Sequence, residues 1–373
     1  MIIILSMMLI PSGLIAVGGI AGMREVLPAD HFQLYSSVSG MGVFTIAMLA
    51  VNGIIGITAQ PHMMSMCATG KTERAGRVGQ TYGSLVKRLA TIGWAFTGLI
   101  VAALVIERGI EFTDHEHAFG FAARVLLFPG LTGLLIACVV AANMSSCSTF
   151  MVNTGALFSQ NLYKEFINPR ANDKQLLWMG RFSGFGLTIL GVLFALSVKN
   201  VLHGFLFTET IAAFMGIIVF SGMMWRRANR YGAFAAVVVS FGLYYILNYH
   251  ASGQFMIVYT WKADSCGWAM LIGFVALIVV SLLTPPEESE KIRKFFDNQC
   301  RLSDREPGPD GKKPYAGEYG HDLILLDFPG WFSRKRWTGF WKRYREDAIG
   351  FVLAWVMVGL LILLAWGIMQ IGR

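Results

Sequence analysis

Four hydroxyl side chains lie together near the centre of a long apolar stretch. The stretch covers residues 131–166, and the hydroxyls belong to Ser145, Ser146, Ser148 and Thr149. Hard cations prefer oxygen ligands, and side chains at positions i and i+3 share one face of a helix. Small hydroxyl residues also let membrane helices pack closely. These residues therefore leave two interpretations open, a cation site or a helix-packing surface.

Two other apolar segments carry polar side chains. Asn52 and Thr58 lie in the segment 39–60, whose glycines permit either a break in a helix or tight helix contact; only a break frees backbone groups for a ligand. Glu209 is either a functional carboxylate or a hydrated group near the outer interface. Counting back from Arg226 places it about 25 Å above the inner interface, which slightly favours the hydrated interpretation.

The composition identifies the environment that must position these residues. The chain is 55% hydrophobic and 14% charged, which excludes an ordinary soluble domain. Its five cysteines form no CxxC pair, so they suggest neither a zinc site nor a disulfide framework. The sequence predicts an all-α, polytopic membrane protein.

About nine apolar segments have the length needed to cross a bilayer. They cover approximately residues 1–22, 39–60, 88–107, 122–160, 176–197, 203–225, 232–248, 265–284 and 347–370. With the amino end in the cytoplasm, 25 of the 31 Lys and Arg residues are cytoplasmic. The positive-inside rule therefore predicts a multi-pass protein of the cell membrane with its amino end inside and its carboxy end outside.

The polar residues divide the chain into three parts. Residues 1–284 hold the core helices, 285–345 form a cytoplasmic loop, and 346–373 hold the final membrane helix. Near its end, the loop alternates tryptophan and phenylalanine with basic side chains over 331–345. Next to a spanning helix, this pattern favours contact with anionic lipid of the bilayer, and we expect no nucleic-acid partner.

Three motifs follow one another along the chain. The first is AQPHMMSMCATGKTERAGR, the second is AANMSSCSTFMVNTGALFSQNLYKEFINP with LLWMGRFSG, and the third is MMWRRANRYGA. They resemble the sodium/solute symporter family, in which they are similar to the end of the sixth core helix, to the eighth core helix with its exit, and to the exit of the tenth. The resemblance covers essentially the whole chain and implies a five-plus-five inverted repeat, with ions and solute bound near the midplane between interrupted helices.

The resemblance also implies roles for particular residues. It places a sodium ion (Na+) at the carbonyl of Ala142 and the hydroxyls of Ser145 and Ser146. A second sodium position, present in some members of the family, would use Ser148 and Thr149. Sodium is a hard cation, so this assignment agrees with the chemistry of the hydroxyl run.

The resemblance begins at the family's fifth core helix. We therefore expect the first four core helices to be absent from residues 1–284 and the chain to be a fragment, a truncated gene product or one partner of another chain. The first interrupted helix, which completes the sodium site in the family, would then lie outside this sequence. Residues 1–373 alone should bind sodium poorly.

The expected function is sodium-coupled symport of a small organic solute, and not catalysis by an enzyme. Asn52 and Thr58 are the candidates for contact with the solute, which the sequence leaves open among sugars, amino acids and carboxylates. The sodium stoichiometry is also open. The alternative is a non-transporting membrane sensor or subunit built on the same fold.

Overall fold

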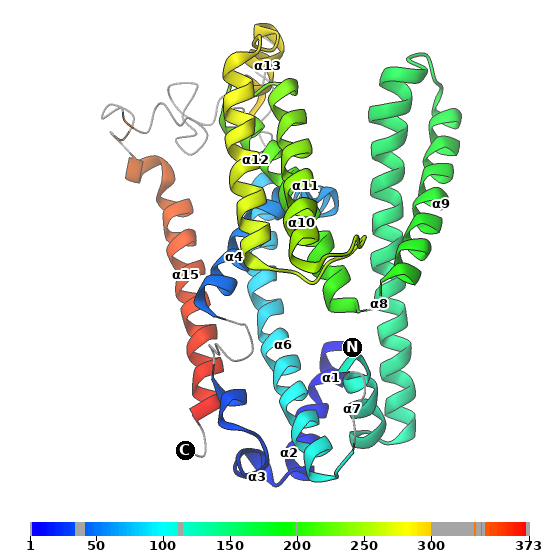
Figure 1. The fold of residues 1–373 in the computed structure, drawn as a ribbon, viewed down its shortest axis with the longest axis vertical. Coiled ribbons are helices and arrows are strands. Elements are labelled where there is room, and N and C mark those ends of the chain that lie inside the picture. Colours follow the sequence, from blue (N-terminus) through cyan, green and yellow to red (C-terminus); the bar gives the residue numbers. More distant parts are fainter. Residues whose placement is uncertain are drawn as a thin grey trace. The chain divides into compact units, whose positions relative to one another are not determined.

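The computed structural model describes residues 2–33, 42–110, 115–198, 200–299, 332, 337 and 340–370 (Figure 1). Every regular element in these ranges is a helix. In chain order the elements are α1 (Ile2–Met7), α2 (Leu9–Ala16), α3 (Gly19–Val26), η1 (Ala29–Phe32), α4 (Val43–Gly56), η2 (Ile57–Ala59), α5 (Pro61–Ala68), α6 (Glu73–Glu107), η3 (His115–His117), α7 (Ala118–Leu126), α8 (Pro129–Ala156), η4 (Leu157–Ile167), α9 (Asp173–Ser197), α10 (Val201–Met224), α11 (Arg230–Ser252), α12 (Ala263–Leu283), α13 (Ser289–Gln299) and α15 (Phe340–Gln370).

The described helices confirm the predicted all-α membrane architecture. Seven of them are long and apolar enough to cross a bilayer, and two bent pairs raise the number to nine if each pair is one span. The third predicted span is part of the longer α6, and the fourth continues from α8 through the π-helix η4. In the basic aromatic segment, Phe332, Trp337 and Trp341 are exposed, while 331, 333–336, 338 and 339 lie outside the described residues.

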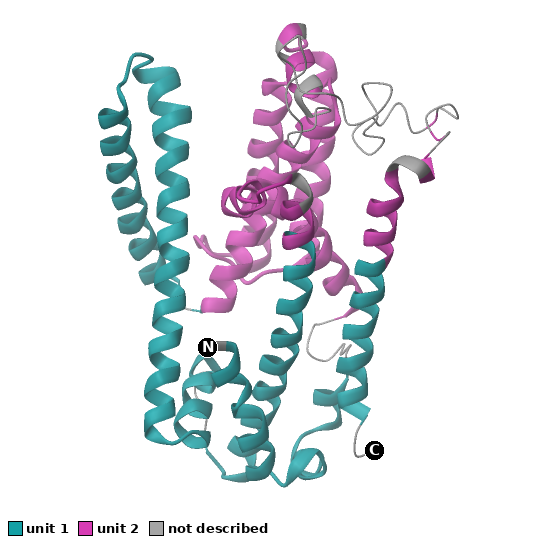
Figure 2. Cartoon of the chain, turned by 180° about the vertical axis from the view of Figure 1, so that it is seen from behind, with its two compact units in different colours: residues 1–36, 80–200, 353–373 teal, residues 37–79, 201–352 magenta. Residues whose placement is uncertain are grey.

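The chain divides into two compact units (Figure 2). Unit 1 contains residues 1–36, 80–200 and 353–373, and unit 2 contains residues 37–79 and 201–352. The predicted hydroxyl run belongs to unit 1. Asn52, Thr58 and Glu209 belong to unit 2, so each candidate site is built within a single unit.

One part of unit 1 packs the short helices α1 to α3 against α6, α7 and α8. Leu9 and Leu135 are fully buried in one apolar cluster, and Met23 is fully buried in a second cluster. The chain bends by 73° between α2 and α3. Gly18 and Gly19 adopt φ angles of 72° and 79° at this bend, which residues with a Cβ rarely adopt.

The other part of unit 1 is the helical hairpin of α8, η4 and α9. A Cβ on Gly155 would lie 2.8 Å from the carbonyl oxygen of Gly180, so the two helices approach through glycine backbone. A capping box begins α9, in which the Asn172 side chain accepts from the Gln175 backbone N–H at 2.9 Å. These local contacts hold the hydroxyl-bearing α8 beside α9.

Unit 2 is centred on the pair α11 and α12, which run side by side (Figure 1). Small residues occur at every fourth position of α11, at Gly232, Ala236 and Ser240, and all three are buried. A Cβ on Gly273 of α12 would lie 1.8 Å from the Ser240 hydroxyl oxygen. The pair is therefore a small-residue contact of the kind that lets membrane helices pack closely.

The second predicted segment does not end at Gln60 as the sequence suggested. It continues as α4, η2 and α5, with a bend of 62° between Ala59 and Pro61. The break coincides with the proline because a proline cannot donate its backbone nitrogen to a continuing helix. Of the glycines in this segment, Gly56 packs closely, because a Cβ there would lie 3.2 Å from the backbone nitrogen of Ala213 in α10, whereas Gly42 and Gly53 meet nothing within 4 Å. From the other side of the contact, a Cβ on Gly216 of α10 would lie 2.1 Å from the carbonyl oxygen of Ile55.

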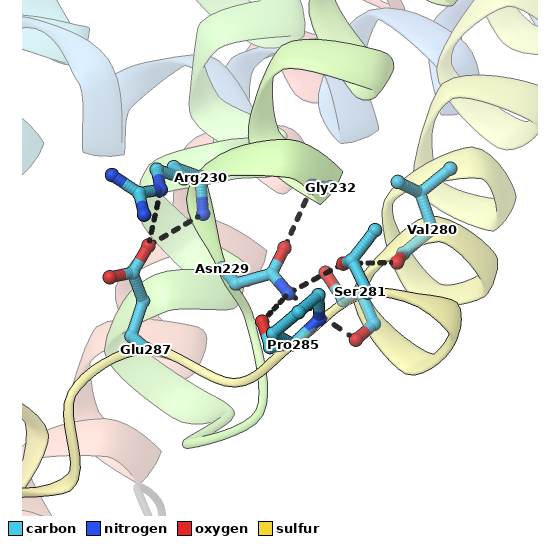
Figure 3. A network of polar contacts seen from close by, with 8 residues as sticks. Asn229, Arg230, Gly232, Val280, Ser281, Pro285 and Glu287 are labelled. Atoms are coloured by element: carbon cyan, nitrogen blue, oxygen red, sulfur yellow. Dashed lines mark hydrogen bonds and ion pairs between the residues drawn. The ribbon is translucent and has the colours of Figure 1, made fainter.

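A polar network ties the start of α11 to the end of α12 (Figure 3). Asn229 accepts from the backbone N–H of Gly232 at 2.9 Å, which caps the first turn of α11. Its amide nitrogen donates to the Thr284 hydroxyl at 2.7 Å and to the Pro285 carbonyl at 3.0 Å. Glu287 accepts from the backbone N–H of Arg230, the residue after Asn229, at 3.2 Å. We call this network the inner clasp.

Candidate functional site

The predicted sodium residues lie on α8, where two of their hydroxyls bond to carbonyls of the same helix. The Ser146 hydroxyl donates to the Ala142 carbonyl at 3.1 Å, so these two oxygens are neighbours on one helix face. The Thr149 hydroxyl donates to the Ser145 carbonyl at 3.0 Å, which places Ser145 beside Thr149. Both bonds follow from helix geometry, because a serine or threonine hydroxyl can reach the carbonyl four residues earlier.

The hydroxyl run is exposed over most of its length. Ala142, Ser145, Ser146 and Ser148 are exposed and Thr149 is half-buried. The buried residues of α8 lie outside the run, at Leu135 and Gly155. A hard cation binds several oxygen atoms at once. In the described part of unit 1, α8 therefore offers oxygens along one side only, and a complete shell needs ligands from elsewhere.

Asn52 is buried in the contact between α4 and α12. Its side chain is 2% exposed, and its amide oxygen lies 3.5 Å from the thiol of the fully buried Cys266. Thr58 also bonds within unit 2, because its hydroxyl donates to the Ile55 carbonyl at 2.7 Å and lies 3.4 Å from the Gly216 carbonyl. These residues lie on either side of the tight contact between α4 and α10. Their hydrogen bonds hold the helices that lead into the break.

The break itself brings together a pair that sequence reasoning did not connect. Gln60 lies between η2 and α5 with an extended backbone, and its amide nitrogen is 3.3 Å from each carboxylate oxygen of Glu209. In the sequence, Gln60 marks the end of the second predicted segment and Glu209 lies inside the sixth, and no pattern connects them. A residue before a proline is biased away from helical backbone, so the Gln60–Pro61 dipeptide could have revealed the break.

The same turn of α10 is also tied to the connection between α11 and α12. The indole N–H of Trp261 donates to the hydroxyl of Thr210 at 3.1 Å. Thr210 is 1% exposed, and it directly follows the half-buried Glu209. The side chains of this turn thus contact the helix break on one side and the 253–262 connection on the other. These contacts form a polar region inside spans of unit 2 that are otherwise apolar.

Comparisons with known proteins agree with these features. The sequence model described as "Sodium:solute symporter family" matches residues 1–240. The chain is 27% identical over 295 residues to the high-affinity proline transporter PutP of Bacillus subtilis, covering 76% of this chain and 58% of that protein. It is 24% identical over 318 residues to the sodium/proline symporter of Escherichia coli, covering 79% of this chain and 58% of that protein.

A relative named for another solute matches as well. The sodium/pantothenate symporter of Haemophilus influenzae is 24% identical over 241 residues, covering 62% of this chain and 49% of that protein. The chain thus spans about half the length of the relatives named here, from 49% to 58%. The matched residues include the hydroxyl run of α8, the break at Gln60–Pro61 and Glu209.

Proposed function

Because this chain belongs to the sodium:solute symporter family, we propose that the protein carries a small organic solute across the cell membrane together with sodium. It would act as a secondary transporter and not as an enzyme. The family match over residues 1–240 is the observation that carries this proposal. Relatives named for proline and for pantothenate support a small organic solute, and the choice between such solutes stays open.

We assign the sodium ion to the hydroxyl run of α8. The ligands would be the Ala142 carbonyl with the Ser145 and Ser146 hydroxyls, and a second ion would use Ser148 and Thr149. The 3.1 Å separation between the Ala142 and Ser146 oxygens supports the assignment, since oxygens this close can contact one ion. Because α8 offers oxygens along one side only, we expect the remaining ligands to come from other segments of the protein or from a second chain.

The solute would contact unit 2 at the break between η2 and α5. A break in a spanning helix leaves backbone groups without helical partners, and such groups can bind a ligand at membrane depth. Asn52 and Thr58 remain the candidates for this contact, as residues of the span that contains the break. The ion and the solute would be coupled because each binds one conformation of the transporter better than the other.

A serine-to-alanine double variant tests the sodium assignment. We expect Ser145→Ala combined with Ser146→Ala, in the full-length protein in proteoliposomes, to lose at least about tenfold of sodium-stimulated solute uptake, because two ligand oxygens are removed. Radiolabelled L-proline and pantothenate serve as probes. Initial uptake rates are measured with and without a sodium gradient.

Thr188→Ala on α9 is the matched control. The Thr188 hydroxyl donates to the Gly184 carbonyl at 3.0 Å and the residue is exposed, so this variant removes a similar bond from a similar surface. Its uptake should remain close to that of the wild type. Unchanged sodium dependence in the double variant would overturn the assignment.

A further inference from the structure

The carboxylate of Glu209 has a single neutral partner. The Gln60 amide nitrogen lies 3.3 Å from both of its oxygens, and Glu209 forms no other hydrogen bond or ion pair with the residues that the structure describes. An amide carries no charge, so it orients the carboxylate without neutralising it. Distances of 3.3 Å are also longer than those of strong charge-assisted hydrogen bonds. The carboxylate therefore keeps most of its capacity to accept further bonds.

Glu209 lies inside a helix long enough to span the membrane, where an ionisable side chain needs a partner. Glu209 lies about 12 Å from the start of α10 along the helix axis, at 1.5 Å per residue, inside a span of 24 residues. Gln60 lies within the bent span formed by Val43–Ala59 and Pro61–Ala68. Ionised side chains inside spans are costly and usually pair with an opposite charge or line a pathway. Because no opposite charge pairs with Glu209 in the described part of unit 2, a ligand is the natural source of one.

The other polar groups near the break are already bonded. The Thr58 hydroxyl donates to a backbone carbonyl, and the Thr210 hydroxyl both accepts from Trp261 and donates to the Leu206 carbonyl at 2.8 Å. Glu209 thus differs from its neighbours in being a carboxyl group whose oxygens keep free acceptor capacity. It lies at the break where we place the solute.

We propose that Glu209, oriented by Gln60, binds a positively charged group of the transported solute. The solute would then be a zwitterion or a cation bearing an ammonium group. A neutral polyol would gain little from the carboxylate, and an anion without a cationic group would be repelled by it. This inference deepens the proposed function and rests on it, because it assumes that the break in unit 2 contacts the solute.

Uptake by the full-length protein in proteoliposomes tests the proposal. The probes are L-proline, which carries an ammonium group and a carboxylate; choline, which is a cation; pantothenate, which is an anion without a cationic group; and myo-inositol, which is neutral. We expect a sodium gradient to drive uptake of L-proline or choline but not of the other two. In Glu209→Gln, the KM for the transported probe should rise at least tenfold, and Glu209→Asp should recover part of that loss.

Two controls separate recognition from stability. Glu209→Gln keeps the size of the side chain and an acceptor for Gln60, so its melting temperature should equal that of the wild type. Glu287→Gln removes a carboxylate from the inner clasp with a side chain 33% exposed, and it should leave the KM unchanged. A purely structural role for Glu209 would lower the melting temperature or the maximal rate and leave the KM where it was.

The possible failures are distinguishable. If the wild type takes up only pantothenate or myo-inositol with sodium, or if Glu209→Gln keeps the wild-type KM, the inference is wrong while the proposed function stands. If the wild type takes up no probe under a sodium gradient, the result contradicts both. A KM effect without any change in sodium dependence would support the inference separately from the sodium assignment.

Discussion

At the scale of single residues, the hydroxyls of α8 can bond either to carbonyls of their own helix or to the proposed sodium ion. Ser146 and Thr149 donate to carbonyls of their own helix, and one such bond contributes only about 1 kcal/mol. The proposed sodium ion would therefore replace it at low cost. The types and spacing of these residues were visible in the sequence. The resemblance already placed the Ala142 carbonyl and the Ser146 hydroxyl in one sodium site, and the four-residue reach of a helical hydroxyl explains why they bond in the structure.

The contact between Gln60 and Glu209 could not be predicted from the sequence. The two residues are 149 positions apart, and no local pattern connects them. The depth estimate for Glu209 assumed a straight helix counted from Arg226 and took no account of neighbouring helices. Such estimates give the position along one helix, whereas the partner of a side chain depends on tertiary packing.

Asn229→Ala tests the inner clasp at this scale. The substitution removes the cap of α11 and leaves the Thr284 hydroxyl without its donor from Asn229, so we expect a loss of about 1–3 kcal/mol in stability. Thermal unfolding in detergent measures it. Asn172→Ala removes an exposed cap of α9 and should cost about 1 kcal/mol or less. Equal losses in the two variants would show that the bonds from Asn229 to the end of α12 contribute nothing.

At the scale of elements, hydropathy predicted the spans but not their irregularities. The apolar runs located the long helices because bilayer thickness sets their length. The position of the break at Pro61 was not predicted, because the glycines of the same segment favour close packing as well as breaks. Gly56 and Gly216 proved to serve packing, since added Cβ atoms there would meet the facing backbone at 3.2 Å and 2.1 Å respectively. The π-helix Leu157–Ile167 likewise had no predicted counterpart.

Gly216→Ala tests the crossing of α10 with α4. The new methyl group would clash with the Ile55 carbonyl, and backbone atoms cannot rotate away as a flexible side chain can. We expect a loss of about 1–3 kcal/mol in stability, together with reduced uptake because the helix leading to the break is displaced. Gly222→Ala lies on the same helix and meets nothing within 4 Å, so it should be neutral or slightly stabilising. Similar melting temperatures for the two variants would contradict the close contact.

At the scale of the whole molecule, the chain is a multi-pass membrane protein, and its orientation remains a prediction from charge. The distribution of basic residues predicts that the amino end and the 285–345 loop are in the cytoplasm. Neither hydropathy nor the division into two units determines this direction. The orientation is indicated only by the unequal distribution of Lys and Arg between the loops on the two sides of the membrane.

Single cysteines test the orientation in intact cells. In a variant with serine in place of the native cysteines, Lys262→Cys should react with a membrane-impermeant maleimide without permeabilisation, because the connection between α11 and α12 is predicted to be outside. Lys71→Cys, in the connection between α5 and α6, should react only after permeabilisation. Both residues are exposed, so accessibility within the protein does not distinguish them. The reverse pattern would require the opposite orientation.

The close packing of α11 and α12 has a consequence for how the molecule is assembled. These helices are joined by a short connection, so their contact closes a small loop and can form as soon as both have entered the membrane. The pairing of Gln60 with Glu209 instead requires two helices that are synthesised far apart in time. We therefore expect the α11–α12 hairpin to be an early folding unit. The α4–α10 pairing closes a much longer loop, so the proposed solute site would depend on the slower of the two steps.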